Sequence, residues 1–273
     1  MKLKIKEVEV KDIVVKSNLP KAPYVANPYT GCHFGCVYCY ADFMRKWSGH
    51  SEEWGQFVDV KINSPSLAEN QNHGGKDVLF SSVTDPYQPL ESRYKLTRQI
   101  LDVLSHQVPQ PEIGILTKSV LVVRDVEILK RFRRCTVGFS FSTLDERVRK
   151  ILEPVTPPIK NRVEAVKRIH DEGVRTYVFI SPIMPYLTAI EEMVSVFKPY
   201  ADYFMFENLN VRPNLWKRIR PALGRIDATL IPRYEEIYFT ETVTISFWEP
   251  IRQEIYRICE REKLEPKLFF HHA

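Results

Sequence analysis

The chain has 273 residues, of which 44% are hydrophobic and 27% are charged, and its formal net charge is +5. This composition excludes an intrinsically disordered chain and fits one large domain, or a barrel with an extension. The five cysteines are an odd number and three share one short stretch, which excludes a disulfide framework and favours a reducing cytoplasm. The sequence has no apolar run of about 18 residues and no signal-peptide core near its N-terminus, so we expect a cytoplasmic protein without membrane contact.

Residues 1–23 alternate lysine with aliphatic side chains, a pattern that predicts short strands. We interpret this segment as a lead-in hairpin that covers one end of a barrel. Residues 24–27 form the first expected core strand, and a cysteine-rich loop follows its carboxyl end. A helix is expected at 41–47 and a short strand at 58–62.

Strands and amphipathic helices then alternate along the chain. Apolar runs predict five further strands, at residues 77–83, 113–117, 136–142, 174–180 and 203–206. The helices between them are expected at 93–107, at 125–132, after a capping box of Thr143 and Glu146, at 161–172, and after a second capping box of Thr188 and Glu191. This alternation is typical of βαβ units and a parallel sheet.

The six expected core strands are too few for a full eight-unit barrel. We therefore predict an α/β fold, a partial (β/α)6 TIM-like barrel, at residues 24–210. Residues 211–273 differ in character, with Trp216, Trp248 and amphipathic stretches near 233–239 and 247–263. We expect them to form a C-terminal helical extension that packs on the barrel.

Three cysteines, Cys32, Cys36 and Cys39, are spaced C-x3-C-x2-C after the first strand. Thiolates bind soft metals and iron–sulfur clusters, and three of them leave one iron of a [4Fe–4S] cluster open for a substrate or cofactor. The glycine before each of the first two cysteines suits a loop that wraps closely around a cluster. Tyr38 can offer a flat aromatic face beside the metal.

Two other interpretations compete with the cluster. The cysteines can be ordinary buried residues, although three of them flanked by glycines disfavour this. They can also bind a structural zinc ion with His33 as fourth ligand. Because His33 directly follows Cys32, joint tetrahedral ligation is awkward, and no second C-x2-C or H-x3-H pair completes a zinc site.

The cysteine motif, with Asn27-Pro28 before it and an aromatic before its third cysteine, resembles the radical S-adenosylmethionine (radical SAM) superfamily. The resemblance implies an open partial barrel and a [4Fe–4S] cluster whose open iron is chelated by S-adenosylmethionine. It implies reductive cleavage to methionine and a 5′-deoxyadenosyl radical, which takes a hydrogen atom from the substrate. It also implies that Tyr38 lies along the adenine and that a flavodoxin or ferredoxin supplies the electron.

Polar side chains follow the expected strands, where the carboxyl ends of a parallel sheet build a site. The candidates are Ser81, Ser82, Thr84, Asp85, Tyr87, Gln88, Thr117, Lys118, Ser119, Ser140, Ser142, Ser181, Glu207, Asn208 and Asn210. A zwitterionic ligand with a ribose requires such donors and acceptors. Lys118 can pair with the methionine carboxylate, and Asp85 or Glu207 can accept from the ribose hydroxyls or the amino group.

The chain resembles more narrowly the spore photoproduct lyase-like branch, also called DNA repair photolyase-like. The matching pieces are Asn27-Pro-Tyr-Thr-Gly-Cys32, Tyr38-Cys-Tyr40, Val83-Thr-Asp-Pro-Tyr-Gln-Pro89, Thr117-Lys-Ser119, Phe139-Ser-Phe-Ser142, Leu152-Glu-Pro154 and Ser181-Pro-Ile-Met-Pro185. The resemblance assigns cofactor contacts to Lys118, to Ser82 and to Ser140 or Ser142, and it aligns Tyr38 and Tyr40 with the tyrosines that flank the lyase's third cysteine. The lyase's hydrogen-returning cysteine after strand two is missing, because this chain has Ser81-Ser-Val83 there.

The substrate stays open between a nucleic acid, a peptide and a small metabolite. A basic group at Lys217, Arg218, Arg220 and Arg225 follows the sixth strand and includes Trp216, which can stack on a base; a solvated helix face is the alternative. A zinc-containing nucleic-acid-binding protein is the rival function. For the enzyme, we expect Tyr40 to be a candidate terminal hydrogen donor, with loop packing as its alternative role.

Overall fold

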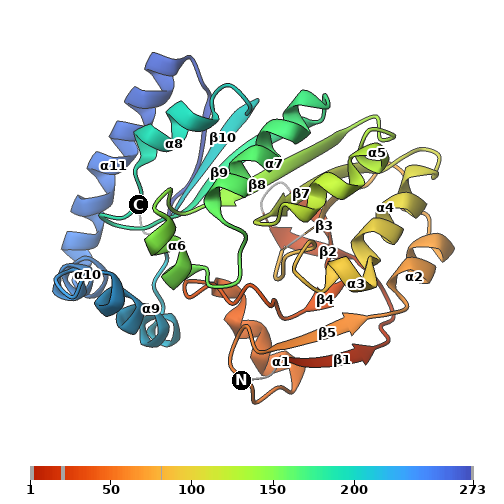
Figure 1. The fold of residues 1–273 in the computed structure, drawn as a ribbon, viewed down its shortest axis with the longest axis horizontal. Helices are drawn as coiled ribbons and strands as arrows, with labels where there is room; N and C mark the ends of the chain where they lie inside the picture. The colour runs from red at the N-terminus through yellow and green to blue at the C-terminus, as the bar shows by residue number, and fades with distance from the viewer. Residues whose placement is uncertain (1–2, 20–21, 81, 272–273) are drawn as a thin grey trace. The chain divides into compact units, whose positions relative to one another are not determined.

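A computed structural model describes residues 3–19, 22–80 and 82–271 (Figure 1). Ser81, one of the candidates above, lies outside the described residues. The larger sheet has eight strands in the order β11-β10-β9-β8-β7-β6-β3-β2. Its strands are β2 (Val14–Leu19), β3 (Ala22–Ala26), β6 (Asp77–Phe80), β7 (Glu112–Thr117), β8 (Cys135–Phe141), β9 (Arg175–Ile183), β10 (Tyr203–Asn208) and β11 (Pro266–Phe269).

The six expected core strands are β3, β6, β7, β8, β9 and β10, and they are neighbours in the order predicted. Pairing is parallel between β3 and β6, between β6 and β7, and between β7 and β8, and again between β9 and β10. Central residues such as Val78, Phe80 and Ile115 are fully buried, as expected for parallel strands covered on both faces. This topology is that of a partial (β/α) barrel, and the predicted fold class is confirmed.

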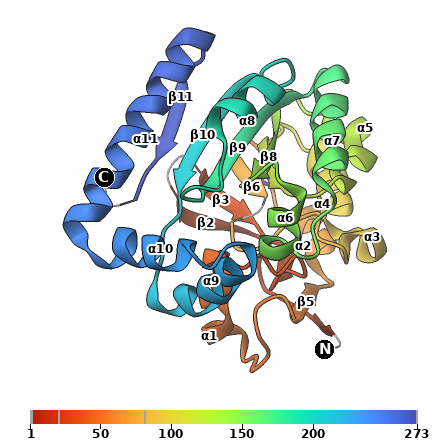
Figure 2. The same cartoon turned by 60° about the vertical axis from the view of Figure 1, so that its left-hand side comes forward.

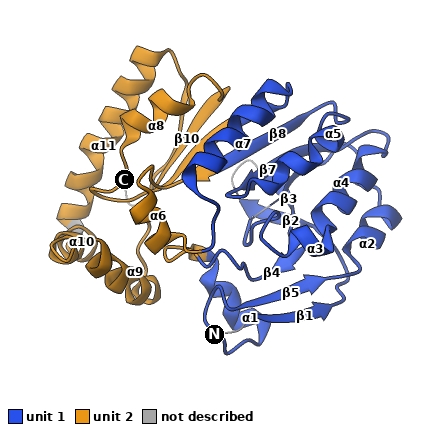
Figure 3. Cartoon of the chain, viewed as in Figure 1, with its two compact units in different colours: residues 1–35, 41–139, 155–176 blue, residues 36–40, 140–154, 177–273 orange. Residues whose placement is uncertain are grey.

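The chain divides into two compact units (Figure 3). Unit 1 comprises residues 1–35, 41–139 and 155–176, and unit 2 comprises residues 36–40, 140–154 and 177–273. The predicted division into a lead-in at 1–23, a partial barrel at 24–210 and a C-terminal extension at 211–273 stays a prediction.

Unit 1 carries eight of the described helical segments. They are η1 (Tyr40–Met44), which begins at the unit boundary, α1 (Arg45–Ser48), α2 (Ser64–Asn70), α3 (Glu91–Tyr94), α4 (Leu96–Ser105), η2 (Leu121–Asp125), α5 (Val126–Leu129) and α7 (Ile159–Asp171). The apolar face of α4 is buried through Leu96, Ile100, Leu101 and Leu104, which recur at helical spacing.

The lead-in hairpin is wrong in its pairing. Strand β1 (Lys4–Val8) does not pair with β2 but runs parallel to β5 (Phe57–Lys61), which also pairs with β4 (Tyr29–Thr30) in a three-stranded sheet. Strand β2 instead forms an antiparallel pair with β3, the first core strand. The alternation of lysine with aliphatic residues correctly predicted a strand. The partner of β1 lies about fifty residues later in the chain, however, and local residue spacing cannot identify it.

Unit 2 carries α6 (Glu146–Leu152), α8 (Ile190–Phe197), α9 (Pro213–Ile226), α10 (Leu230–Phe239) and α11 (Glu241–Glu262). The two amphipathic stretches expected in the C-terminal segment are helical in α10 and α11. The segment also adds β11, which pairs in parallel with β10 and lies beside α11 in Figure 2. Trp248 of α11 is fully buried and packs edge-on against Phe247 and Phe270.

Both predicted capping boxes are wrong. Asp145 caps α6, because its carboxylate accepts from the backbone nitrogens of Arg147 and Val148. The N-cap of α8 is Ala189, while the Thr188 hydroxyl donates to the Ser142 carbonyl at 2.6 Å. None of the described helices is long and apolar enough to cross a membrane.

Candidate functional site

The first part of the cysteine loop, up to Gly35, belongs to unit 1. Gly31 and Gly35 have φ values of +84° and +58°, which favour glycine. A Cβ at Gly31 would also meet the Phe57 carbonyl oxygen at 2.5 Å, so a side chain does not fit there. Cys32 between them is buried. The backbone is thus bent tightly around this cysteine, as the sequence predicted.

The segment after β6 holds this part of the loop through the backbone of Gly31 and His33. The Gly31 carbonyl accepts from Thr84 Oγ1 at 2.6 Å and from Gln88 Nε2 at 3.2 Å, and Gln88 Oε1 accepts from His33 N at 2.9 Å. Gln88 is fully buried. Thr84 and Gln88 therefore fix the loop entering Cys32.

Asn27, which precedes the cysteine loop, also forms hydrogen bonds with the segment after β6. Its Nδ2 donates to Ser82 Oγ at 2.7 Å, and its Oδ1 accepts from the backbone nitrogens of Ser82 at 3.0 Å and Val83 at 3.3 Å. Ser82, predicted to contact the cofactor, is thereby placed by the residue that opens the cysteine motif.

Asp85 directs its carboxylate to its own chain. It accepts from Thr117 Oγ1 at 2.6 Å and from the backbone nitrogens of Lys118 and Tyr87 at 2.8 Å each. Burial raises the pKa of Asp85, and these three hydrogen bonds oppose that rise. Asp85 therefore fixes the turn that presents Lys118, whose side chain is half-buried.

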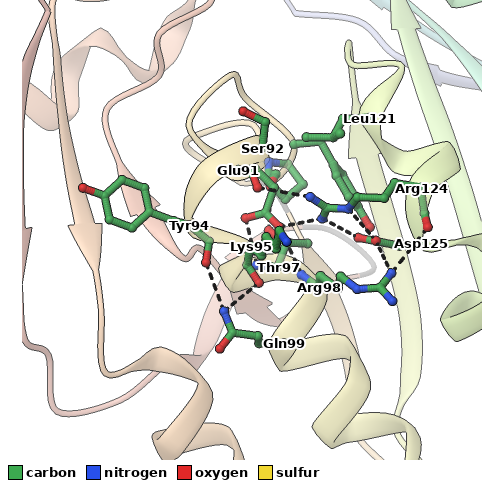
Figure 4. A network of polar contacts seen from close by, with 12 residues as sticks. Glu91, Ser92, Tyr94, Lys95, Thr97, Arg98, Gln99, Leu121, Arg124 and Asp125 are labelled. Atoms are coloured by element: carbon green, nitrogen blue, oxygen red, sulfur yellow. Dashed lines mark hydrogen bonds and ion pairs between the residues drawn. The ribbon is translucent and has the colours of Figure 1, made fainter.

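An ionic network around the buried carboxylates of Glu91 and Asp125 links α3 to η2 (Figure 4). The Glu91 carboxylate accepts from Arg124 Nη2 at 2.9 Å and from Thr97 N at 3.0 Å. Arg124 and Arg98 each donate to Asp125 at 2.7 Å. Because Glu91 opens α3 and Arg124 lies in η2, the network ties the segment after β6 to the helix that follows Lys118.

The second part of the cysteine loop, Cys36–Tyr40, belongs to unit 2. The Tyr38 hydroxyl donates to Glu153 Oε1, and Ser142 Oγ donates to the same oxygen at 2.9 Å. The backbone nitrogen of Val37 donates to the Leu152 carbonyl at 2.8 Å. Burial raises the pKa of Tyr38 well above its usual range, and the negative charges of Glu153 and Cys36 add to the rise. Tyr38 is thus held as a neutral phenol on a buried carboxylate.

Ser140 and Glu207 both form a hydrogen bond with Ser181, which lies near the end of β9. Ser140 Oγ donates to the Ser181 carbonyl at 3.0 Å, and Ser181 Oγ donates to Glu207 Oε2 at 2.6 Å. The other carboxylate oxygen of Glu207 lies 3.1 Å from His271 Nε2. The ends of β8, β9 and β10 therefore share one chain of hydrogen bonds.

Tyr40 is 51% exposed. Its pKa is nevertheless raised, first by desolvation of the phenol and then by the nearby Cys39 and Glu207. The phenol stays protonated at neutral pH.

Cys135 and Cys259 lie away from the motif, at the start of β8 and inside α11. Burial raises the pKa of Cys135 to about 12 and that of Cys259 to about 11. Thiols with such pKa values are poor metal ligands and poor nucleophiles near neutral pH.

The site residues divide between the units: Cys32, Ser82, Asp85 and Lys118 lie in unit 1, and Cys36, Tyr38, Cys39, Tyr40, Ser140, Ser142 and Glu207 lie in unit 2. Among the residues that the structure describes, no group of three His, Cys, Asp or Glu side chains is identified as a metal site. The ligand set Cys32, Cys36 and Cys39 therefore rests on its spacing and on the chemistry of the thiols. Three thiols in a glycine-bent, hydrogen-bonded loop fit the donor set of an iron–sulfur cluster.

Sequence reasoning gave no role to three residues that hold the loop, Asn27, Leu152 and Glu153, whereas Gln88 was a candidate as a polar residue after the second core strand. Asn27, Gln88 and the Leu152-Glu153-Pro154 segment were parts of matching motifs, and a polar side chain inside such a motif was the available signal.

Residues 26–197 match the family model of the radical SAM superfamily. An uncharacterised protein of Methanocaldococcus jannaschii is 38% identical over 211 residues, which cover 77% of this chain and 80% of that protein. A radical SAM Nα-GlyT isomerase of Pseudomonas phage M6 is 22% identical over 186 residues, covering 65% of this chain and 36% of that protein. Among solved structures, spore photoproduct lyase complexed with dinucleoside spore photoproduct has a TM-score of 0.71 at 14% identity, with 98% of this chain and 82% of that chain covered.

Proposed function

The chain belongs to the radical SAM superfamily and is an enzyme of that class, and we propose that Cys32, Cys36 and Cys39 ligate a [4Fe–4S] cluster that binds S-adenosylmethionine. The observation that carries the proposal is the family match across residues 26–197, which includes all three cysteines in C-x3-C-x2-C spacing. Such a cluster, when reduced, cleaves S-adenosylmethionine to methionine and a 5′-deoxyadenosyl radical, which takes a hydrogen atom from the substrate.

The chain's own residues position the cofactor in this proposal. Lys118 pairs with the methionine carboxylate, and Asp85 sets its place by accepting from the Lys118 backbone nitrogen. Glu153 fixes the ring of Tyr38 for contact with the adenine. Glu207 accepts from the amino group or the ribose.

Three serines complete the set of polar groups in the proposal. Ser82, Ser140 and Ser142 are held by Asn27, Ser181 and Glu153, so that their hydroxyls have defined directions before the cofactor binds. Such preorganisation reduces the entropy lost on binding.

We propose a nucleic acid as the substrate class, since the structurally similar lyase was solved with a dinucleoside spore photoproduct. The specific lyase reaction is disfavoured because residues 81–83 contain no cysteine. A peptide or small metabolite is the alternative. We also propose that the enzyme is cytoplasmic and that a flavodoxin or ferredoxin supplies its electron.

The test is anaerobic reconstitution with iron and sulfide, followed by metal analysis and chromatography of 5′-deoxyadenosine after reduction. We expect about four irons per chain and cofactor cleavage, and loss of both when Cys32, Cys36 or Cys39 is replaced by alanine. A colourless protein that retains one zinc ion after reconstitution would overturn the proposal and favour the zinc-containing binding protein.

A further inference from the structure

Arg218 of α9 reaches the cysteine loop. Its Nη2 donates to the Cys36 carbonyl at 2.8 Å, although the two residues are separated by 182 positions in the chain. The sequence placed Arg218 in a basic group, for which substrate contact and a solvated helix face were the two interpretations. The structure instead directs its guanidinium to the backbone of a predicted cluster ligand, whereas its neighbours Lys217 and Arg220 are exposed.

The other terminal nitrogen of Arg218 is buried and has no hydrogen-bond partner among the described residues. A buried donor of a charged group without an acceptor carries a substantial desolvation cost. The protein accepts this cost beside Cys36, and an electron-rich group bound by the loop would provide the missing acceptor. Thiolate and sulfide sulfurs of an iron–sulfur cluster are acceptors of this kind.

Other contacts of Cys36–Tyr40 bring groups of different charge to this part of the loop. Val37 N donates to the carbonyl of Leu152, the last residue of α6, and the Tyr38 hydroxyl donates to Glu153, the residue after it. These contacts bring neutral backbone and negative charge to the loop. Arg218 brings a positive charge, and it binds Cys36, the residue before Val37 and Tyr38.

From this geometry we propose that Arg218 is a positioning residue for the cluster, which holds the Cys36 backbone and keeps a positive charge beside the reduced state. The inference rests on the proposed function. A cluster held by three thiolates becomes more negative on reduction, and a nearby guanidinium stabilises the more negative state. Removing that charge should therefore lower the midpoint potential.

The experiment is an EPR-monitored potential titration of the reconstituted full chain without S-adenosylmethionine. At the wild-type midpoint potential, we expect the ratio of reduced to oxidised cluster to fall about tenfold in Arg218→Gln, equal to about 59 mV for a one-electron couple. Arg218→Lys, which retains the charge, should stay near wild type. Lys217→Gln removes the adjacent exposed charge and is the matched control, with an unchanged potential expected.

A second measurement uses the protein without its cluster. We expect iodoacetamide to label Cys36 and Cys39 several-fold faster in Arg218→Gln than in wild type, with the buried Cys259 as internal reference. Faster labelling supports the hold on the backbone. Unchanged labelling would show that Arg218 does not hold the backbone, which by itself overturns the inference.

Other outcomes distinguish a failure of the proposed function from a failure of this inference. If the wild-type chain binds no iron, the proposed function fails and this inference fails with it, whereas a normal cluster with an unchanged potential in Arg218→Gln overturns this inference alone. If Arg218→Gln is folded but binds no iron while Arg218→Lys does, the need for the charge is supported. If both variants unfold, Arg218 is a packing residue and the inference is wrong.

Discussion

Glu153 offers a direct test of how unit 2 holds the cysteine loop. Its carboxylate is 1% exposed and accepts from the Tyr38 and Ser142 hydroxyls. Replacing Glu153 with alanine leaves both hydroxyls without this acceptor. It also removes the buried group that links the loop to the end of β8.

The size of the effect follows from these contacts. A hydrogen bond to a charged acceptor contributes roughly 1.5–3 kcal/mol, so two contribute about 3–6 kcal/mol. Part of this is offset because Glu153→Ala no longer desolvates a carboxylate. We expect the free energy of unfolding to fall by about 2–4 kcal/mol, in the range for a broken buried polar network.

Urea unfolding of the protein without its cluster, followed by circular dichroism, measures this loss as a lower midpoint concentration at unchanged slope. The matched control is Glu236→Gln, an exposed position in the same unit, for which we expect a change within about 0.5 kcal/mol. A double-mutant cycle with Tyr38→Phe should give a coupling energy above about 0.5 kcal/mol. If Glu153→Ala is as stable as the control, or the two changes are additive, the carboxylate does not hold the loop.

Three further predictions concern the candidate site. Lys118→Met should weaken S-adenosylmethionine binding about tenfold or more in equilibrium dialysis, because a charge-assisted contact contributes roughly 1.5–3 kcal/mol; an unchanged affinity would refute that role. Tyr40→Phe should retain its cluster and its uncoupled 5′-deoxyadenosine formation but lose product formation once a substrate is known, and a wild-type product rate would assign Tyr40 to packing. Cys135→Ala and Cys259→Ala should keep full iron content, and iodoacetamide should label the two native thiols only as the pH rises toward their pKa values of about 12 and about 11. Iron loss in Cys135→Ala, or rapid labelling of either thiol at pH 8, would contradict the ligand set or their burial.

The parallel core was predictable because its signal is local. Strands β7 and β8 carry buried apolar residues at alternate positions, Ile113 and Ile115 in β7 and Val137, Phe139 and Phe141 in β8, and this alternation is a local signal of a strand. Strand β11 was missed because its four residues are only half-buried and its partner, β10, lies about sixty residues earlier in the chain. The pairing of β1 with β5 failed as a prediction for the same reason, since local pattern gives strand type but not partner.

The helix starts illustrate a competition between neighbouring caps. Thr143 and Asp145 are both good N-cap residues, and the carboxylate at 145 prevails by accepting from two backbone nitrogens. Thr188 was equally suited by type, but its hydroxyl is used across the fold, on the Ser142 carbonyl. The sequence shows which residues can cap a helix, but tertiary contacts determine which of them does.

The candidate residues stay predictions from residue type and position, and the residues that form hydrogen bonds with them were not predictable from the sequence. Glu153 reaches Tyr38 across 115 positions and Arg218 reaches Cys36 across 182. No local periodicity records such contacts. Arg218 was even assigned to the surface, because a basic helix has the same composition whether one of its arginines faces solvent or a loop.

The segment after β6 bears on how the proposed reaction ends. In the spore photoproduct lyase-like branch this segment is expected to carry a hydrogen-donating cysteine, whereas here Thr84 and Gln88 bind the backbone of the cysteine loop. The segment holds the loop and contains no cysteine, so the proposed reaction needs a hydrogen donor of another kind, with Tyr40 as the candidate and Tyr87, Tyr186 or solvent as alternatives. Tyr40 follows Cys39, is half exposed and has a raised pKa, so that its phenol keeps the hydrogen atom that a donor must supply. Because a phenylalanine at that position would fill the same space without that hydrogen, the Tyr40→Phe comparison separates hydrogen donation from loop packing.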